Sequence, residues 1–183
     1  MPPLLLVPIH PVEIECIEPL RTVLQKIFRL ETTIDTRAHL DAAPAFDAYR
    51  NQCNSSLLLT LLQEHFPRYE GKILGITSVD LFVPVLTYVF GEAQLNGTAA
   101  VVSTYRLNDT LYGFPENHQQ YTERLAKEAV HELGHTFGLY HCLEYGCVMH
   151  SSTTVEDIDI KGTNFCMKCL HAVVKKMSLL SES

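Results

Sequence analysis

Three histidines and a glutamate lie within eleven residues of this chain, at a spacing that suits a catalytic metal site. His131 and His135 are four residues apart, so they share one face of a helix and can bind one zinc ion. Glu132 follows the first histidine and can act as a general base toward water at that zinc. Gly138 can adopt the left-handed conformation that ends a helix, which would bring back His141 as the third ligand. Three protein ligands leave a fourth position open, as catalytic zinc sites do.

The residues around this motif favour a helix that buries one face and turns its histidines toward a cleft. At about 100° per residue, the apolar side chains fall in one arc, His131 and His135 lie opposite, and Glu132 lies near the boundary. The alternatives are a surface helix with two chance histidines and a histidine that is hydrogen-bonded inside the core. Both fit less well, because the motif is long and both histidines face away from the arc. The arc consists of Leu125, Ala126, Ala129, Val130, Leu133 and Phe137.

Four cysteines follow the histidines in two short-spaced pairs, C-x4-C and C-x2-C. Such pairs let four thiolates surround one metal ion as a tetrahedron, and zinc suits four such ligands. Two disulfides and free buried thiols are the alternatives. Because Cys142 directly follows His141, a closed zinc site here would hold the loop that presents the third histidine. Cys16 and Cys53 lie far from this set and are expected to be ordinary small buried residues. The set is Cys142, Cys147, Cys166 and Cys169.

The composition is that of a globular chain. Its 183 residues are 46% hydrophobic and 19% charged, which suits one domain with a core. A net charge of −7 argues against a nucleic-acid partner, and no apolar run is long enough to span a membrane. The apolar N-terminus lacks basic residues and a small-residue cleavage site, so we expect a buried strand there and a cytoplasmic protein. In a reducing compartment, cysteines serve as ligands or thiols more often than as disulfides.

Hydrophobic periodicity and turn residues predict the elements that position these side chains. Strands are expected at 4–9, 32–36, 72–79, 85–90 and 98–104, with Asn96-Gly97 as a turn between the last two. A helix is expected at about 13–28, where Pro19 must lie in the first turn or the helix starts later. Further helices are expected at 55–66, capped by Ser55 or Ser56, and at 117–137. A last helix at 167–179 would turn inward Leu170, Val173, Val174 and Met177. Residues 39–51 are expected to be a loop, and 156–159 a solvated turn.

The order of these elements predicts the architecture. Early strands and helices alternate, and a hairpin then leads into the histidine-bearing helix, so we expect an α/β (α+β) fold with a mixed twisted sheet. Residues 1–183 would form a single domain. Its N-terminal subdomain would span 1–138 and a small C-terminal subdomain, with the cysteines, would span 139–183. The cleft would lie between the two.

The metal-binding motifs resemble a known family. HExxHxxGxxH is similar to the metzincin clan of zinc peptidases, which also place a methionine in a turn under the metal. Here Met149 follows His141 by eight positions. Four cysteines interleaved with that methionine resemble the archaemetzincin family specifically, closely over residues 131–169 and less diagnostically over 97–107.

The resemblance implies a metzincin fold and a division of roles. His131, His135 and His141 would hold a catalytic zinc, Glu132 would serve as general base and acid, and the cysteines would hold a structural zinc. It also implies that the strand at 98–104 is the sheet edge along which an extended peptide binds. Tyr140 and Tyr145 lie near the motif, where ordinary packing is the favoured interpretation for both.

A zinc-dependent metallopeptidase is therefore the expected function. It would carry two zinc ions per chain, act on peptide or protein substrates, and work as a monomer without nucleic-acid or membrane partners. The alternative is a non-catalytic, zinc-stabilised module that binds peptides or acts as a scaffold. Glu132 argues against the alternative, because a purely structural site has no use for that carboxylate.

Overall fold

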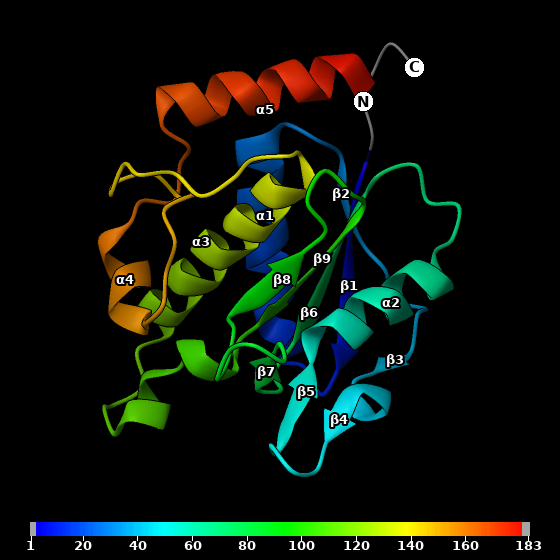
Figure 1. The fold of residues 1–183 in the computed structure, drawn as a ribbon, viewed down its shortest axis with the longest axis vertical. Coiled ribbons are helices and arrows are strands. Elements are labelled where there is room, and N and C mark those ends of the chain that lie inside the picture. The colour runs from blue at the N-terminus through cyan, green and yellow to red at the C-terminus, as the bar shows by residue number, and fades with distance from the viewer. Residues whose placement is uncertain (1–2, 181–183) are drawn as a thin grey trace.

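A twisted mixed sheet lies between two layers of helices at the centre of the structure (Figure 1). The computed structural model describes residues 3–180. The sheet contains β1 (Leu4–His10), β2 (Thr32–Ile34), β3 (Leu40–Asp41), β6 (Lys72–Thr77), β8 (Gly91–Ala93) and β9 (Ala99–Ser103). Their order is β2-β1-β6-β9-β8, with β3 beside the end of β1. All neighbours are parallel except β8, which is antiparallel to β9. This confirms the predicted α/β architecture with a mixed sheet.

Helices cover both faces of this sheet. α1 (Ile17–Phe28) and α3 (His118–Thr136) pack on one face, and α2 (Ser55–His65) packs on the other. Along β1, Leu4 and Leu6 point toward α1 and α3, whereas Leu5 and Val7 point toward α2. A strand buried on both faces reads as a continuous apolar run, which is why this segment is recognisable in the sequence.

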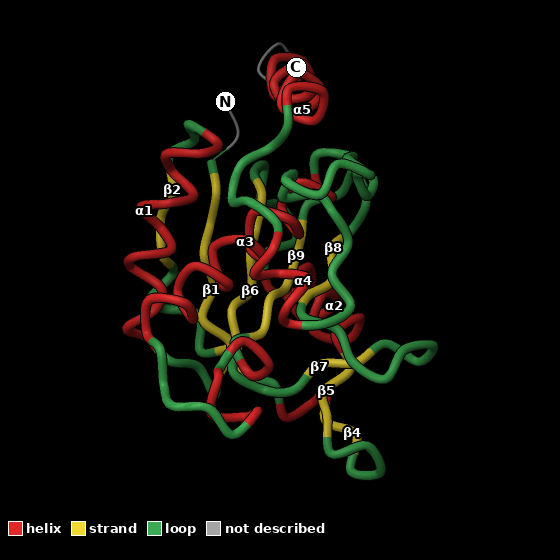
Figure 2. The backbone as a smooth tube through the Cα atoms, turned by 90° about the vertical axis from the view of Figure 1, so that its left-hand side faces the viewer, coloured by secondary structure: helices red, strands yellow, loops and turns green. Residues whose placement is uncertain are grey.

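The chain after α3 forms a part with little regular structure. It contains α4 (Val155–Ile160) and α5 (Met167–Leu180), joined by long loops. α5 crosses the end of the molecule at which β1 begins, as both views show (Figures 1 and 2). A second, small sheet and four 3-10 helices complete the described chain. The sheet contains β4 (Phe46–Asp47), β5 (Gln52–Asn54) and β7 (Leu81–Phe82), and the 3-10 helices are Ile14–Cys16, Ala43–Ala45, Tyr105–Leu107 and Asp109–Tyr112.

Helix ends follow from local chemistry. Pro19 lies in the first turn of α1, as predicted. The cap of α2 is not a serine: the Asn54 side chain accepts hydrogen bonds from the next turn, because the helix already begins at Ser55. Asn117 caps α3 in the same way. At the other end of α3, Gly138 adopts the predicted left-handed conformation with φ of 85°.

The strand predicted at 85–90 is wrong. Pro84 begins a turn in which the Leu86 N–H donates to the Val83 carbonyl, and Val85 projects into solvent. Regular pairing with β9 starts only at Gly91. The predicted loop at 39–51 also differs, since it contains β3 and β4.

The predicted sheet edge is wrong as well. β9 corresponds to the strand at 98–104, but β6 pairs with it on one side and β8 on the other. The edge of the sheet at this end is β8.

Two predictions in the C-terminal part also need correction. The inner face of α5 carries Cys169, Val173 and Met177, whereas Leu170 and Val174 are exposed, because Cys169 must face the other cysteines. Residues 156–159 form part of α4 and not a solvated turn, since Thr154 and Asp157 cap that helix reciprocally. The predicted single domain, 1–183, includes residues 1–2 and 181–183, which lie outside the described range. Between residues 3 and 180, no helix combines the length and apolarity that a membrane span requires.

Candidate active site and metal centres

α3 carries the two helical histidines and the glutamate to the floor of a cleft of about 620 Å³. His131 and Glu132 are buried, while His135 is half-buried. The other wall of the cleft includes β8 and the segment before it. The helix is buried around most of its circumference, so its histidines occupy a polar strip between packed surfaces and do not lie on an open face.

The three histidines converge on one point. The Nδ1 of His131 lies 2.8 Å from the Val148 carbonyl oxygen, and that of His135 lies 2.7 Å from the Leu139 carbonyl oxygen. Each ring therefore carries its N–H at Nδ1 and donates it to its own carbonyl. Each Nε2 atom then has a lone pair available for a metal, and the two Nε2 atoms are 3.1 Å apart. One ligand atom from each of His131, His135 and His141 lies within 4.8 Å of the others. This geometry fits a zinc ion with three imidazole ligands.

Burial also favours the metal-binding form of these rings. It lowers the pKa of His131 far below the usual histidine value, and lowers the pKa of His135 and His141 in the same direction. A neutral imidazole is the form that binds zinc. The histidine cluster is therefore held deprotonated at neutral pH.

Glu132 lies beside this cluster in a dry environment. Burial, followed by the negative charge of Glu128, raises the pKa of Glu132 well above the usual carboxyl value. A raised pKa makes a carboxylate a stronger base, so Glu132 is suited to accept a proton and to return it. Gly91 on β8 packs directly against the Glu132 side chain, with no room for a side chain of its own.

Met149, the methionine that the resemblance implies to lie under the metal, is buried against α3 next to Gly134, which directly precedes His135. Its sulfur fills the space above Gly134 on α3, and its carbonyl oxygen accepts the Cys142 N–H at 2.8 Å. That hydrogen bond ties the turn to the segment that follows His141. One loop thus supports the third histidine and begins the cysteine cluster.

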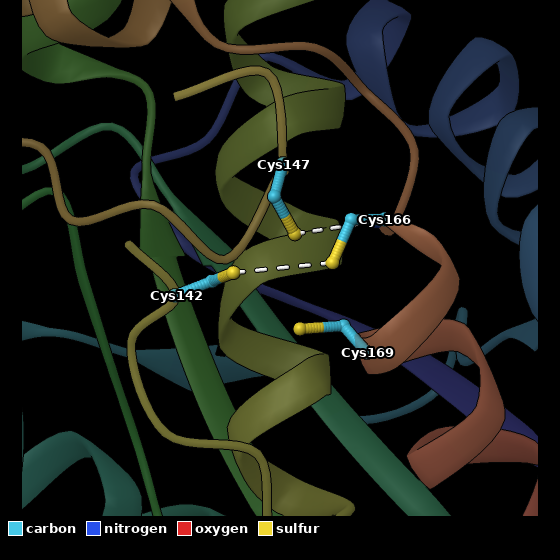
Figure 3. A group of neighbouring side chains, drawn as sticks. All are labelled: Cys142, Cys147, Cys166 and Cys169. Carbon is cyan, nitrogen blue, oxygen red and sulfur yellow. Dashed lines mark hydrogen bonds between the residues drawn. The ribbon is translucent and has the colours of Figure 1, made fainter. Parts of the chain in front are cut away.

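The four cysteines gather in front of α3 (Figure 3). Their sulfurs lie within 4.8 Å of one another, and those of Cys142 and Cys166 are 3.9 Å apart. Sulfurs bound to one zinc at 2.3 Å in a tetrahedron are about 3.8 Å apart, so the set fits a closed zinc site. All four are free cysteines, which does not support the disulfide alternative. Cys16 and Cys53 are buried elsewhere, as predicted.

Sequence reasoning missed several residues of this region. Glu128 and Lys161 form a buried ion pair beside His131, and Gly91 contacts Glu132. Glu128 precedes Glu132 by four residues, so helical spacing alone could have placed it on the same face. Lys161 carried no such signal, since it lies thirty residues from His131. Tyr140 is exposed and lines the cleft, so ordinary packing does not describe it. For Tyr145 that interpretation agrees with the structure, because its largely exposed ring packs at a tilt against His150, with the ring centres 4.7 Å apart.

Comparison with known proteins agrees with this geometry. A sequence model of peptidase family M54 matches residues 20–175. An archaemetzincin of Methanocaldococcus jannaschii is 43% identical over 126 residues, which cover 69% of this chain and 68% of the relative. The crystal structure of archaemetzincin from Methanopyrus kandleri superimposes with a TM-score of 0.82 at 31% identity, covering 97% of this chain and 96% of that one. That of the Archaeoglobus fulgidus protein gives 0.80 at 35% identity, covering 92% and 98%. The chain therefore belongs to the archaemetzincins, peptidase family M54, and is a zinc metallopeptidase.

Proposed function

We propose that this chain hydrolyses peptide bonds at the histidine cluster, with Glu132 as the general base. The observation that carries the proposal is that the Nε2 atoms of His131 and His135 lie 3.1 Å apart in the same cleft that the buried Glu132 side chain lines. A zinc ion held by the three histidines supplies Lewis-acid activation of water and of the scissile carbonyl group. Glu132 then accepts a proton from the attacking water and returns it to the leaving amine nitrogen.

The substrate is proposed to bind along β8, the edge strand of the sheet. β8 borders the cleft, and its open side can add an extended peptide as a further antiparallel or parallel strand. Main-chain hydrogen bonds then hold the peptide, and apolar cleft residues contact its side chains. This wall of the cleft includes Val83, Leu86, Val89 and Phe90.

A second zinc ion is proposed at the four cysteines, where it supports the fold and takes no part in the chemistry. Four thiolates leave no position open for water or substrate. The division of the chain at residue 138, the monomeric state and the cytoplasmic location stay predictions from the sequence.

The test compares peptide hydrolysis by the wild type and by Glu132→Gln, using a broad peptide library. Glutamine keeps the shape of the side chain and cannot accept the proton, so kcat should fall by on the order of 10²–10⁴-fold with both zinc ions retained. Glu123→Gln is the matched control, because Glu123 is an exposed carboxylate on the same helix. Full activity in Glu132→Gln, or loss of zinc from it, would refute the assigned role. An inactive wild type would favour the non-catalytic module.

A further inference from the structure

A lysine from outside the motif is buried against the first histidine of the cluster. Lys161 follows α4, and its side chain has an exposed fraction of 0%. Its Nζ lies 2.7 Å from a carboxylate oxygen of Glu128 and 3.4 Å from the His131 Nδ1. It also donates to the His150 carbonyl oxygen at 3.3 Å. One ammonium group thus touches the active-site helix, the first histidine and the end of the methionine turn.

Glu128 explains why a positive charge is needed at this place. It lies one helical turn before Glu132, lines the same cleft, and has a side chain that is only 4% exposed. A third carboxylate of the cleft, Glu92, is held by the hydroxyl groups of Ser55 and Ser56. Without Lys161, two carboxylates on one helix face would be buried close together with no opposite charge beside Glu128.

The His131 Nδ1 does not take the lysine's proton. This nitrogen carries its own N–H, which donates to the Val148 carbonyl. The ammonium and the imidazole are therefore in contact without a hydrogen bond, and the partner of the lysine charge is Glu128. Removing Glu128 would leave an uncompensated ammonium in contact with His131, and removing Lys161 would leave an uncompensated carboxylate in the cleft that the histidines line.

We infer that Lys161 is a positioning residue for the hydrolytic site, acting through its ion pair with Glu128. The pair holds the Glu128 carboxylate away from Glu132 and keeps the net charge near His131 close to zero. Through the His150 carbonyl it also fastens the methionine turn to α3. The effect on turnover rests on the function proposed above, whereas the effect on metal binding at the histidines does not.

The two partners should affect metal affinity with opposite signs. Lys161→Met leaves a carboxylate beside the histidines, so the affinity of the histidine site for Zn²⁺ should stay equal or rise. Glu128→Gln leaves an ammonium group there, and the affinity should fall by about tenfold or more. A residue that only stabilises the fold would weaken metal binding in both variants.

The experiment titrates Zn²⁺ against a competing chelator, using protein whose cysteine site is already loaded. The variants are Lys161→Met, Glu128→Gln and their combination, with kcat, KM and Tm measured on zinc-saturated samples. Both single variants should lose kcat with little change in KM. The double variant, which carries neither charge, should recover zinc affinity and part of kcat.

Lys127→Met is the matched control. Lys127 lies on α3 and is buried, as Lys161 is. Its Nζ donates to the carbonyls of Ile158 and Asp159 and not to Glu128 or His131. Its loss should lower Tm and leave zinc affinity and kcat unchanged.

Three results would overturn the inference. The first is a shift of zinc affinity with the same sign in both single variants. The second is a double variant whose zinc affinity and kcat are no higher than those of Glu128→Gln. The third is an active enzyme in which neither single variant changes kcat. If Lys161→Met does not fold, the comparison of Glu128→Gln with the double variant still decides. If the wild type cleaves no peptide, the proposed function fails, and the zinc affinities still test the ion pair.

Discussion

Gly91 and Glu132 are in direct contact, although they are forty-one residues apart in the chain. A Cβ built on Gly91 would lie 2.7 Å from the Glu132 Cγ and 2.6 Å from the Val101 carbonyl oxygen. The first distance is shorter than non-bonded contacts between carbon atoms in real structures. The second is to a backbone atom of β9, which cannot move as a side chain can. β8 therefore approaches α3 this closely only because residue 91 is a glycine.

Gly91→Ala should impair turnover by displacing Glu132. The new methyl group cannot move the β9 backbone easily, so the glutamate side chain must shift, and kcat should fall by on the order of 10²-fold. Zinc content should stay at the wild-type value, because the atoms nearest to the new group belong to Val101 and Glu132 and not to a histidine or cysteine of the metal sites. Steady-state kinetics with metal analysis would check this. Gly146→Ala is the control, since a Cβ there meets nothing within 4 Å. A kcat equal to that of the wild type would contradict the prediction, because it would show that the new methyl group does not displace Glu132 from its working position.

Gly134→Ala should destabilise the fold through Met149. The added methyl group would overlap the methionine sulfur, which is buried and cannot move into solvent. Overpacking of this kind costs about 1–3 kcal/mol of unfolding free energy. Shortening the partner with Met149→Val should restore part of the loss in the double variant, and chemical denaturation of all four proteins measures the coupling. Additive effects of the two changes would argue against this contact as the cause.

The glycines near the histidines illustrate which features could be predicted from the sequence and which could not. Gly138 was recognisable because its role is local: the chain must turn between two ligands of one motif. The histidines and cysteines were recognisable for the same reason, since ligand spacing in a short segment reflects local geometry. β1 and α3 were predictable from their apolar patterns.

Contacts between segments that are far apart in the sequence could not be predicted in this way. Gly91 matters because of Glu132, and Lys161 matters because of Glu128, but neither pair has a spacing that predicts contact. The predicted strand at 85–90 failed because the β-branched and apolar residues there line a cleft, which they can do from a turn. The sheet edge was misplaced because β9 and β8 both have the composition of strands, and only pairing decides which lies outside.

The two proposed zinc sites should differ in how their loss changes metal stoichiometry and thermal stability. Cys166→Ala should leave one zinc per chain and lower Tm by at least about 10 °C, because binding energy at a closed thiolate site is folding energy. His135→Ala should also leave one zinc, with a smaller change in Tm, since its half-buried ring faces the cleft. Cys53→Ala should keep both ions, as Cys53 lies in the core on the other face of the sheet. Metal analysis and thermal melts give the answer. Equal Tm values for Cys166→Ala and the wild type would contradict a structural role.

The last prediction concerns Lys72, whose amine is buried at the C-terminal end of α3. Its Nζ donates to the carbonyls of Gly97 and Thr136 and lies 4.8 Å from the centre of the Phe137 ring. Burial nevertheless dominates and, with the positive charge of Lys176, lowers the pKa of Lys72 from 10.5 to about 8. The folded protein therefore releases this proton at a lower pH than the unfolded chain does.

The sign of the pH effect follows from that difference. Between pH 8 and pH 10.5 the unfolded chain holds more protons than the folded protein, so the free energy of unfolding should rise with pH in this interval. The rise should be at most about 3 kcal/mol relative to Lys72→Met, in which the titrating group is absent. Denaturation of zinc-loaded wild type and variant at matched pH values measures it, because other titrating groups cancel in the difference. Should the difference instead fall with pH, the two carbonyls and the ring stabilise the ammonium by more than burial penalises it, and Lys72 is a charged cap on α3.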